Sequence, residues 1–167
     1  RCGFCAVPRG RPGEIGLDAA EPANVARMAA SLELRHVVIT SVNRDDLEDG
    51  GSHHFAETVR EVRKALPQAR IEVLVPDFCG DPDAVARVLD AGPDIFNHNM
   101  ETVERLYRRV RPFAVYQQSL DVLDDLLLAL AVDDGVGAVS HGARVDCRLA
   151  RGEMQRQPGR SPARLTR

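Results

Sequence analysis

The sequence is short of several features that would define its class. No apolar run reaches the ~20 residues that a membrane-spanning helix needs, so no span is predicted. Four cysteines in 167 residues are too few for a secreted disulfide scaffold, which favours a cytoplasmic or organelle-matrix protein with reduced thiols, and we expect the cytoplasm. A net charge of −3 gives no overall attraction to nucleic acid or anionic membrane, so neither is expected as a partner. Lys64 is the only lysine among 22 basic residues, a bias of GC-rich coding, so the arginines alone do not indicate phosphate binding.

What the sequence does contain is a repeating α/β pattern. Apolar residues make up 44% and charged residues 28%, as in a globular domain with one core. Strand, polar loop and helix follow one another three times in steps of about 30 residues, which predicts parallel strands joined by helices. We expect strands at 36–41, 71–76 and 94–97, and helices at 19–34, 54–66, 83–92, 102–109 and 117–130.

Three local features of this pattern predict burial and helix ends. Asp18 can cap the first helix, in which Val25, Met28, Ala29 and Leu32 recur at the spacing of one buried face. The run HVVIT shows no alternation, so we expect a strand covered on both faces. His53 and His54 lie at a predicted helix start, where they are expected at the surface.

The polar loops all follow the carboxyl ends of the predicted strands, the edge that carries function in βα barrels and open α/β sheets. The first is SVNRDDLEDGG, whose two glycines permit close backbone approach; a solvated surface loop is the alternative. In FNHNMET, alternation directs Asn97, Asn99 and Glu101 to one side if the backbone stays extended. A capping role for Asn99 is the alternative there.

Cys2 and Cys5 form a CxxC pair, whose tight turn can direct two thiolates to one metal. Zinc ribbons, rubredoxin-like sites, redox pairs and iron–sulfur loops all use this spacing, and a chance pair is a further alternative. A zinc site would need a second pair, but Cys79 and Cys147 have no spaced partner. A redox pair is expected between a strand and a helix, whereas this pair precedes every predicted element.

The segments RCGFCAVPRGRP, VVITSVNRDDLEDGGSHHFAETVREVR, IEVLVPDF and DIFNHNMETVERLYRRVRP, in this order and spacing, resemble lipoyl synthases, which are radical S-adenosylmethionine enzymes. The resemblance covers about residues 1–128. It implies a partial radical SAM (β/α) TIM-like barrel with parallel strands and the helices outside. We therefore expect two parts, a partial radical SAM core at 1–130 and a divergent arginine-rich tail at 131–167. The tail is interpreted as either disordered or read out of frame.

The resemblance also implies a chemistry that the residues alone do not. Such enzymes hold a [4Fe–4S] cluster through CxxxCxxC and bind S-adenosylmethionine on it, which yields a 5′-deoxyadenosyl radical. Lipoyl synthases then insert two sulfurs, supplied by an auxiliary [4Fe–4S] cluster, into a protein-bound octanoyl group. The implied partners are octanoylated lipoyl carrier domains of 2-oxoacid dehydrogenases or the glycine cleavage H protein, and an electron donor such as ferredoxin or flavodoxin.

The implied site residues are carried over by position in the motifs. Cys2 and Cys5 match the second and third cluster cysteines, and Phe4 matches an apolar residue that shields the cluster. The residues that match cofactor-binding positions are Thr40, Ser41, Asn43, Arg44, Asp46, Asn97, Asn99, Glu101 and Arg111.

The sequence also departs from the family pattern. The first cysteine of CxxxCxxC would stand three residues before Arg1, and the auxiliary-cluster cysteines do not occur in the sequence. Cys79 and Cys147 are not where replacement ligands are expected, so this chain alone is expected to be inactive. Two alternatives remain open: a non-catalytic remnant or CxxC metal-binding module, and an interaction module that uses the basic tail from Arg144 to Arg167.

Overall fold

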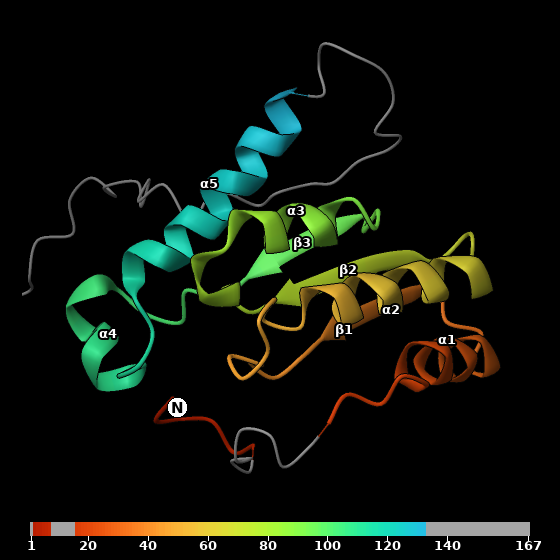
Figure 1. Cartoon of the computed structure of the whole chain (residues 1–167), viewed down its shortest axis with the longest axis horizontal. Coiled ribbons are helices and arrows are strands. Elements are labelled where there is room, and N and C mark those ends of the chain that lie inside the picture. Colours follow the sequence, from red (N-terminus) through yellow and green to blue (C-terminus); the bar gives the residue numbers. More distant parts are fainter. Residues whose placement is uncertain (1, 8–15, 133–167) are drawn as a thin grey trace, which may run out of the picture.

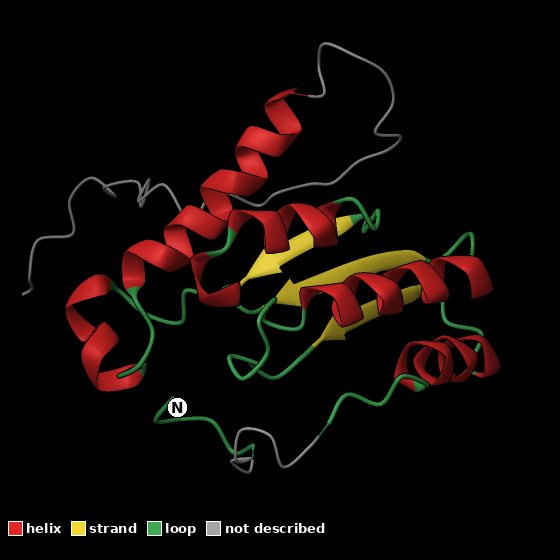
Figure 2. Cartoon of the chain, viewed as in Figure 1, coloured by secondary structure: helices red, strands yellow, loops and turns green. Residues whose placement is uncertain are grey.

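The computed structural model describes residues 2–7 and 16–132, with side chains described as far as residue 125 in the last helix. Its elements alternate as expected (Figures 1 and 2). They are α1 (Glu21–Ser31), β1 (His36–Thr40), α2 (Ser52–Ala65), β2 (Arg70–Val75), the 3₁₀ turn η1 (Phe78–Gly80), α3 (Pro82–Leu89), β3 (Ile95–His98), α4 (Glu104–Val110) and α5 (Tyr116–Val132). The expected tail at 131–167 lies outside the described residues from 133 onward.

The three strands form one parallel sheet in the order β1-β2-β3. Val37 pairs with Ile71, and Val73 with Phe96, so these buried side chains form a continuous apolar layer. Figure 1 shows α2 and α3 side by side along the sheet. The parallel strands with helices packed against them confirm the α/β class and agree with part of a (β/α) barrel.

The helices cover one face of the sheet and leave the other open. Along β1, Val37 and Ile39 are buried, whereas Val38 between them is 59% exposed. The expectation that this strand is covered on both faces is therefore wrong. A β-branched run fits a pleated surface whichever face is covered, and here no described element packs on the second face.

The burial expected for α1 is also partly wrong. The buried residues are Pro22, Ala26 and Ala29, whereas Met28 and Leu32 are each 61% exposed. Small alanine side chains allow α1 to pack closely on α2. Asp18 does not cap the helix: Ala20 is the N-cap residue, and the Asp18 carboxylate accepts from the Ala20 N–H at 2.9 Å, in the turn just before it.

Carboxylates in the loops fix where α2 and α3 begin. Asp49 accepts hydrogen bonds from the backbone N–H groups of Gly51 at 3.0 Å and His53 at 2.9 Å. Asp81 caps α3 by accepting from the Asp83 N–H at 3.0 Å, with Pro82 at the first helical position. At the start of α2, His53 is exposed as expected, but the His54 ring is partly buried and its Nε2 lies 2.8 Å from a Glu21 carboxylate oxygen.

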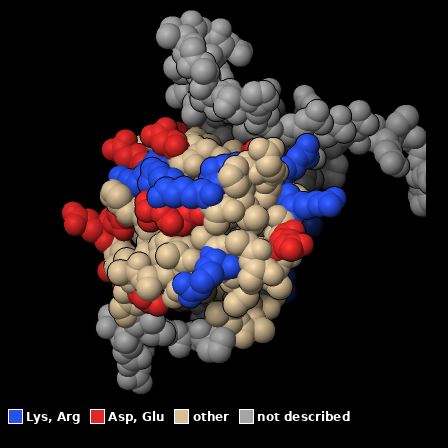
Figure 3. Space-filling view, turned by 90° about the vertical axis from the view of Figure 1, so that its right-hand side faces the viewer, with Lys and Arg blue, Asp and Glu red and all other residues tan. Residues whose placement is uncertain are grey.

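At the amino ends of the strands, Arg63 joins three segments. Its guanidinium donates to the carbonyls of Ala69 at 2.7 Å and Gly92 at 3.1 Å, and to the Asp94 carboxylate at 2.6 Å. The same Asp94 oxygen accepts from the Ile71 N–H at 2.7 Å. Figure 3 shows this end of the molecule, where cationic and anionic side chains are intermixed rather than gathered by sign. No helix in the described part of the chain is long and apolar enough to cross a membrane.

Candidate functional site

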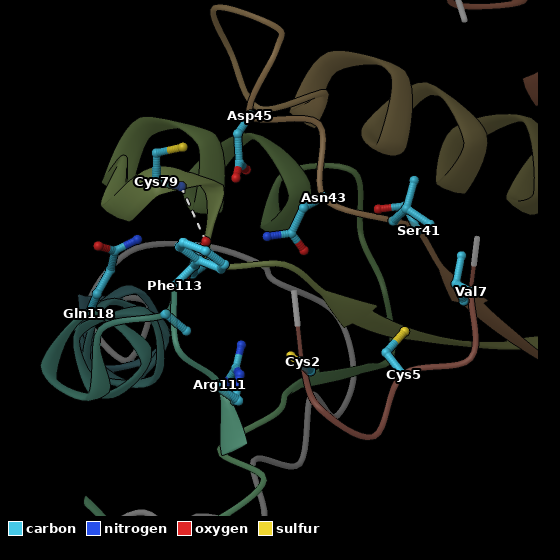
Figure 4. Close-up of a pocket in the computed structure, with 13 residues that line it drawn as sticks. Cys2, Cys5, Val7, Ser41, Asn43, Asp45, Cys79, Arg111, Phe113 and Gln118 are labelled. Carbon is cyan, nitrogen blue, oxygen red and sulfur yellow. Dashed lines mark hydrogen bonds between the residues drawn. The ribbon is translucent and has the colours of Figure 1, made fainter. Parts of the chain in front are cut away.

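A cavity of about 580 Å³ lies at the carboxyl ends of the strands. Five segments contribute to it: the N-terminal segment, the loops that follow β1 and β2, the turn between α4 and α5, and α5 itself (Figure 4). The residues that line it are Cys2, Cys5, Val7, Ser41, Val42, Asn43, Asp45, Asp77, Cys79, Arg111, Phe113, Ala114 and Gln118. The loops after β1 and β2 thus meet at one edge as expected, whereas the loop after β3 contributes no lining residue.

The N-terminal segment brings both cysteines of the CxxC pair to this cavity. The Cys5 N–H donates to the Cys2 carbonyl at 3.3 Å, which closes a tight turn, and the Gly3 N–H donates to the Val110 carbonyl at 2.9 Å, which fastens the turn to the end of α4. Both thiols are free, and Phe4 between them is 56% exposed. The turn can therefore present two thiolates to one metal centre.

The loop after β1 holds four residues expected to bind the cofactor, and two of them line the cavity. Ser41 and Asn43 line the cavity. Arg44 instead makes a two-pronged ion pair with Asp46, with both N···O distances at 2.8 Å. Gly51, with φ of +82°, lies beside this pair, and a Cβ atom there would stand 3.3 Å from the Arg44 Cβ. Arg44 and Asp46 therefore shape the loop that carries Ser41 and Asn43.

Thr40, the last residue of β1, does not line the cavity. Its hydroxyl donates to the Leu74 carbonyl at 3.1 Å, across to β2.

The opposite wall of the cavity holds a third cysteine. Cys79 lies in η1 with φ of +56°, and Figure 4 shows it with Asp45 across the cavity from Cys2 and Cys5. Burial raises the pKa of the Cys79 thiol. The nearby carboxylate of Asp45, which also hydrogen-bonds the thiol, raises this pKa further, and so does the carboxylate of Asp77. That Cys79 is not a replacement cluster ligand stays a prediction.

Arg111 is the cationic side chain of the cavity lining in the described part of the chain. Its Nη1 donates to the Asn99 carbonyl and to the Tyr107 hydroxyl, both at 2.7 Å, and its guanidinium carbon lies 5.2 Å from the centre of the Tyr107 ring. The Tyr107 hydroxyl is also within 2.8 Å of the Ser119 hydroxyl, so α5 helps to hold the arginine. Within the described residues its Nε–H is buried without a hydrogen-bond partner. Arg111 is thus rigidly held and able to bind a carboxylate.

The segment FNHNMET does not stay extended. β3 ends at His98, and Glu101 adopts a left-handed conformation with φ of +63°. The extended backbone that would place Asn97, Asn99 and Glu101 on one side is therefore interrupted, and none of the three lines the cavity. The Asn97 side-chain amide instead donates a hydrogen bond to the Glu72 carboxylate, and the Asn99 backbone carbonyl accepts one from Arg111. The alternative, a capping Asn99, is also wrong, because Val103 is the N-cap residue of α4 and no side chain caps it.

His98, the last residue of β3, has a largely buried ring. Its Nδ1 bonds the Val75 carbonyl at 2.9 Å, so Nδ1 carries the hydrogen. Burial lowers the pKa of His98, which keeps the imidazole neutral near pH 7.

Sequence reasoning missed part of the cavity lining, chiefly Asp45, Asp77, Cys79 and Gln118. Asp77 carries a signal that could have found it, because it is a polar residue in the loop that follows β2, as Ser41 is in the loop that follows β1. Gln118 carries none, because its place depends on how α5 folds back against η1 and α3.

Residues 1–132 match the model of the Radical SAM superfamily. The chain belongs to the radical SAM superfamily. Its relatives include the lipoyl synthases of Leptospira interrogans, 54% identical over 123 residues, and Rubrobacter xylanophilus, 58% identical over 122 residues. These matches cover 74% and 73% of this chain but 40% and 37% of the relatives.

A third lipoyl synthase, from Halorubrum lacusprofundi, is 50% identical over 147 residues, which cover 84% of this chain and 46% of that protein. The chain thus spans less than half the length of these curated relatives. The findings do not favour the alternative of a non-catalytic remnant or a separate CxxC module.

Membership of the superfamily implies a [4Fe–4S] cluster and S-adenosylmethionine. The chemistry of the cavity lining suits a cluster and S-adenosylmethionine, because two thiols of a tight turn lie beside serine, asparagine and arginine side chains. Among the described residues, however, no three His, Cys, Asp or Glu side chains are grouped to hold a metal. The described residues thus bring two free thiols, those of Cys2 and Cys5, to the cavity.

Proposed function

We propose that this chain is the central part of a lipoyl synthase, whose whole protein inserts two sulfurs into an octanoyl group carried by a protein. The observation that carries the proposal is the meeting of the CxxC thiols with Ser41, Asn43 and Arg111 in one cavity. The high identity to lipoyl synthases of three organisms supports the choice of this reaction within the superfamily.

In this proposal, Cys2 and Cys5 supply two of the three thiolates that hold the cluster. When bound, the cluster and S-adenosylmethionine supply the radical that activates the octanoyl chain. Arg111 binds the carboxylate of S-adenosylmethionine, since it is held from behind by Tyr107 and Asn99. Ser41 and Asn43 provide hydrogen bonds to its polar groups, and the rigid Arg44–Asp46 pair keeps their loop in place.

The remaining expectations belong to the whole protein. We propose octanoylated lipoyl carrier domains as the substrate, ferredoxin or flavodoxin as the class of electron donor, and the cytoplasm as the location. The auxiliary cluster that donates sulfur would be held by residues outside the matched part, because the sequence contains no further cysteine cluster.

A chimera tests the proposal without depending on where this chain begins or ends. Residues 1–125 replace the matching segment of the Rubrobacter xylanophilus lipoyl synthase, to which this chain is 58% identical. The chimera is reconstituted anaerobically and supplied with an octanoylated carrier domain and a reductant. We expect lipoyl product by mass spectrometry of the carrier. A folded chimera that binds its clusters but yields no lipoyl group would contradict the proposal.

A further inference from the structure

Helix α4 carries three arginines on the face that is directed away from the rest of the fold. Arg105, Arg108 and Arg109 are exposed, and their spacing of three and four residues places them together on one face of the helix. We call it the arginine face. The opposite face holds Tyr107, which is buried and whose hydroxyl lies 2.8 Å from the Ser119 hydroxyl of α5. This contact attaches α4 to α5 and leaves the arginines directed outward.

The positive charge of the arginine face is not balanced by partners. Within the described part of the chain, none of its three arginines forms an ion pair or a side-chain hydrogen bond. By contrast, the exposed Arg60 and Lys64 of α2 each pair with a glutamate of their own helix. Residues 101–112 contain four arginines and two glutamates, although the whole chain has a net charge of −3. Such a local excess of one sign attracts a surface of the opposite sign.

The helix that carries this face lies next to the cavity. The Gly3 N–H donates to the carbonyl of Val110, the last residue of α4, so the CxxC turn is fastened to the helix. Phe113, in the turn from α4 to α5, lines the cavity and is 77% exposed. Figure 1 shows α4 beyond the carboxyl ends of the strands, beside the N-terminal segment. Arginine and aromatic side chains are both enriched where proteins bind other proteins.

We propose that the arginine face of α4 is the docking surface for the protein that carries the octanoyl group, and that this protein presents carboxylates around its modified lysine. The inference rests on the proposed function. An acyl group on a lysine side chain enters the cavity only when the backbone of its carrier lies close to the opening, so the carrier must contact the surface around it. The negative net charge of the chain disfavours nucleic acid or an anionic membrane as the occupant.

The test compares a large and a small substrate of the reconstituted chimera with the Rubrobacter xylanophilus protein. The large substrate is the octanoylated glycine cleavage H protein, and the small one is a tripeptide that carries octanoyl-lysine without carboxylate side chains. Arg105→Gln, Arg108→Gln and Arg109→Gln are combined in one variant. Its KM for the H protein should rise about tenfold at nearly constant kcat, the combined effect of three exposed ion pairs. Its turnover of the tripeptide should stay the same, because the tripeptide does not reach the arginine face.

A matched control removes the same charge elsewhere. Arg27→Gln, Arg35→Gln and Arg70→Gln change three exposed arginines on α1 and at the amino ends of β1 and β2, at the far end of the sheet from the cavity. In this control variant the KM for the H protein should stay within about twofold. Lysine at the three positions of α4 keeps the charge and should restore most of the original KM. Added salt should raise the KM more steeply in the unchanged chimera than in the α4 glutamine variant.

An unchanged KM for the H protein in the α4 glutamine variant would overturn the docking surface. An equal rise of the KM in the control variant, or an equal loss of tripeptide turnover in the α4 variant, would overturn it as well. If the triple variant does not fold by circular dichroism, the three single variants decide, each with an expected rise in KM of about twofold. A chimera that forms no lipoyl product from either substrate would instead overturn the proposed function. Calorimetric titration of the H protein into the chimera, with and without the α4 substitutions, would then decide the docking surface on its own.

Discussion

At the scale of single residues, Asp49 illustrates how one carboxylate orders both a loop and a helix. Burial acts to raise the pKa of Asp49, but hydrogen bonds from the backbone and ring of His53 and from the Gly51 N–H outweigh it and lower that pKa to about 2. The folded state therefore binds the proton more weakly than the unfolded chain. The stabilisation is fully present above about pH 4, the pKa of an unfolded aspartate, and is lost as the pH falls toward 2.

Replacing Asp49 should change the free energy of unfolding over the same pH range. Asp49→Ala should lower the free energy of unfolding by about 1 kcal/mol near pH 7, the usual effect of removing a carboxylate from the start of a helix. The difference from the unchanged chain should shrink between about pH 4 and 2. Urea unfolding followed by circular dichroism measures both. Glu48→Ala, an exposed neighbour, is the control, and an equal loss in that variant would argue against a specific role for Asp49.

The site residues that sequence could predict are those that directly follow a strand or lie in a spaced motif. Ser41, Asn43 and the CxxC pair were found in this way, and all of them line the cavity. The hydrogen bonds that join Glu72 to His36 and Asn97 were not predicted, because a glutamate within a strand gives no sign of its partners. These bonds depend on the register of β1 and β3 with β2, which only the folded sheet sets.

At the scale of elements, Arg63 of α2 holds together the amino ends of β2 and β3. Burial acts to raise the pKa of Asp94, but the Ile71 N–H and the Arg63 guanidinium outweigh it and lower that pKa. The Arg63–Asp94 pair is therefore strongest above the pKa of an unfolded aspartate and weakens as acid protonates Asp94. The two backbone carbonyls that Arg63 also binds would lose a donor if it were replaced.

Arg63→Met should therefore lower the free energy of unfolding by about 1–3 kcal/mol, since it leaves part-buried acceptors without a partner. Arg60→Met, on the same helix, removes only an exposed pair with Glu57 at 3.6 Å and should change stability by about 0.5 kcal/mol or less. Thermal and urea unfolding of the two variants side by side provide the measurement. Equal losses in both variants would contradict the role assigned to Arg63.

Element types and order followed from sequence periodicity, but the burial of individual faces did not. In β1 and α1, the same apolar residues would suit either of two faces, and the neighbours decide which face is covered. Val38 is exposed because helices pack on only one side of the sheet, and Met28 because α1 meets α2 through alanines. β3 ends at His98, within one residue of the expected end, but the turn after it could not be predicted, because the left-handed Glu101 carries no sequence signal such as glycine.

At the scale of the whole molecule, the cavity at the carboxyl ends of the strands holds the two thiols that we propose as cluster ligands, Cys2 and Cys5. Cys79 lies across the cavity from them, and among the described residues no three His, Cys, Asp or Glu side chains are grouped to hold a metal. We therefore expect the 167-residue chain to assemble less than one [4Fe–4S] cluster per chain on anaerobic reconstitution. Mössbauer spectroscopy and iron analysis measure this. Cys79→Ala should leave the iron content unchanged, and a loss of iron in that variant would show that Cys79 is a ligand after all.

The central claim is that Cys2 and Cys5, beside Ser41, Asn43 and Arg111, form the place where S-adenosylmethionine is cleaved. The most direct test is the amount of 5′-deoxyadenosine formed by the reconstituted chimera with the Rubrobacter xylanophilus protein, separated by chromatography. Cys5→Ala should abolish the product, because two thiolates do not hold the cluster, whereas Cys79→Ala should retain most of it. Product formation that survives Cys5→Ala, or that is lost in Cys79→Ala, would contradict the account.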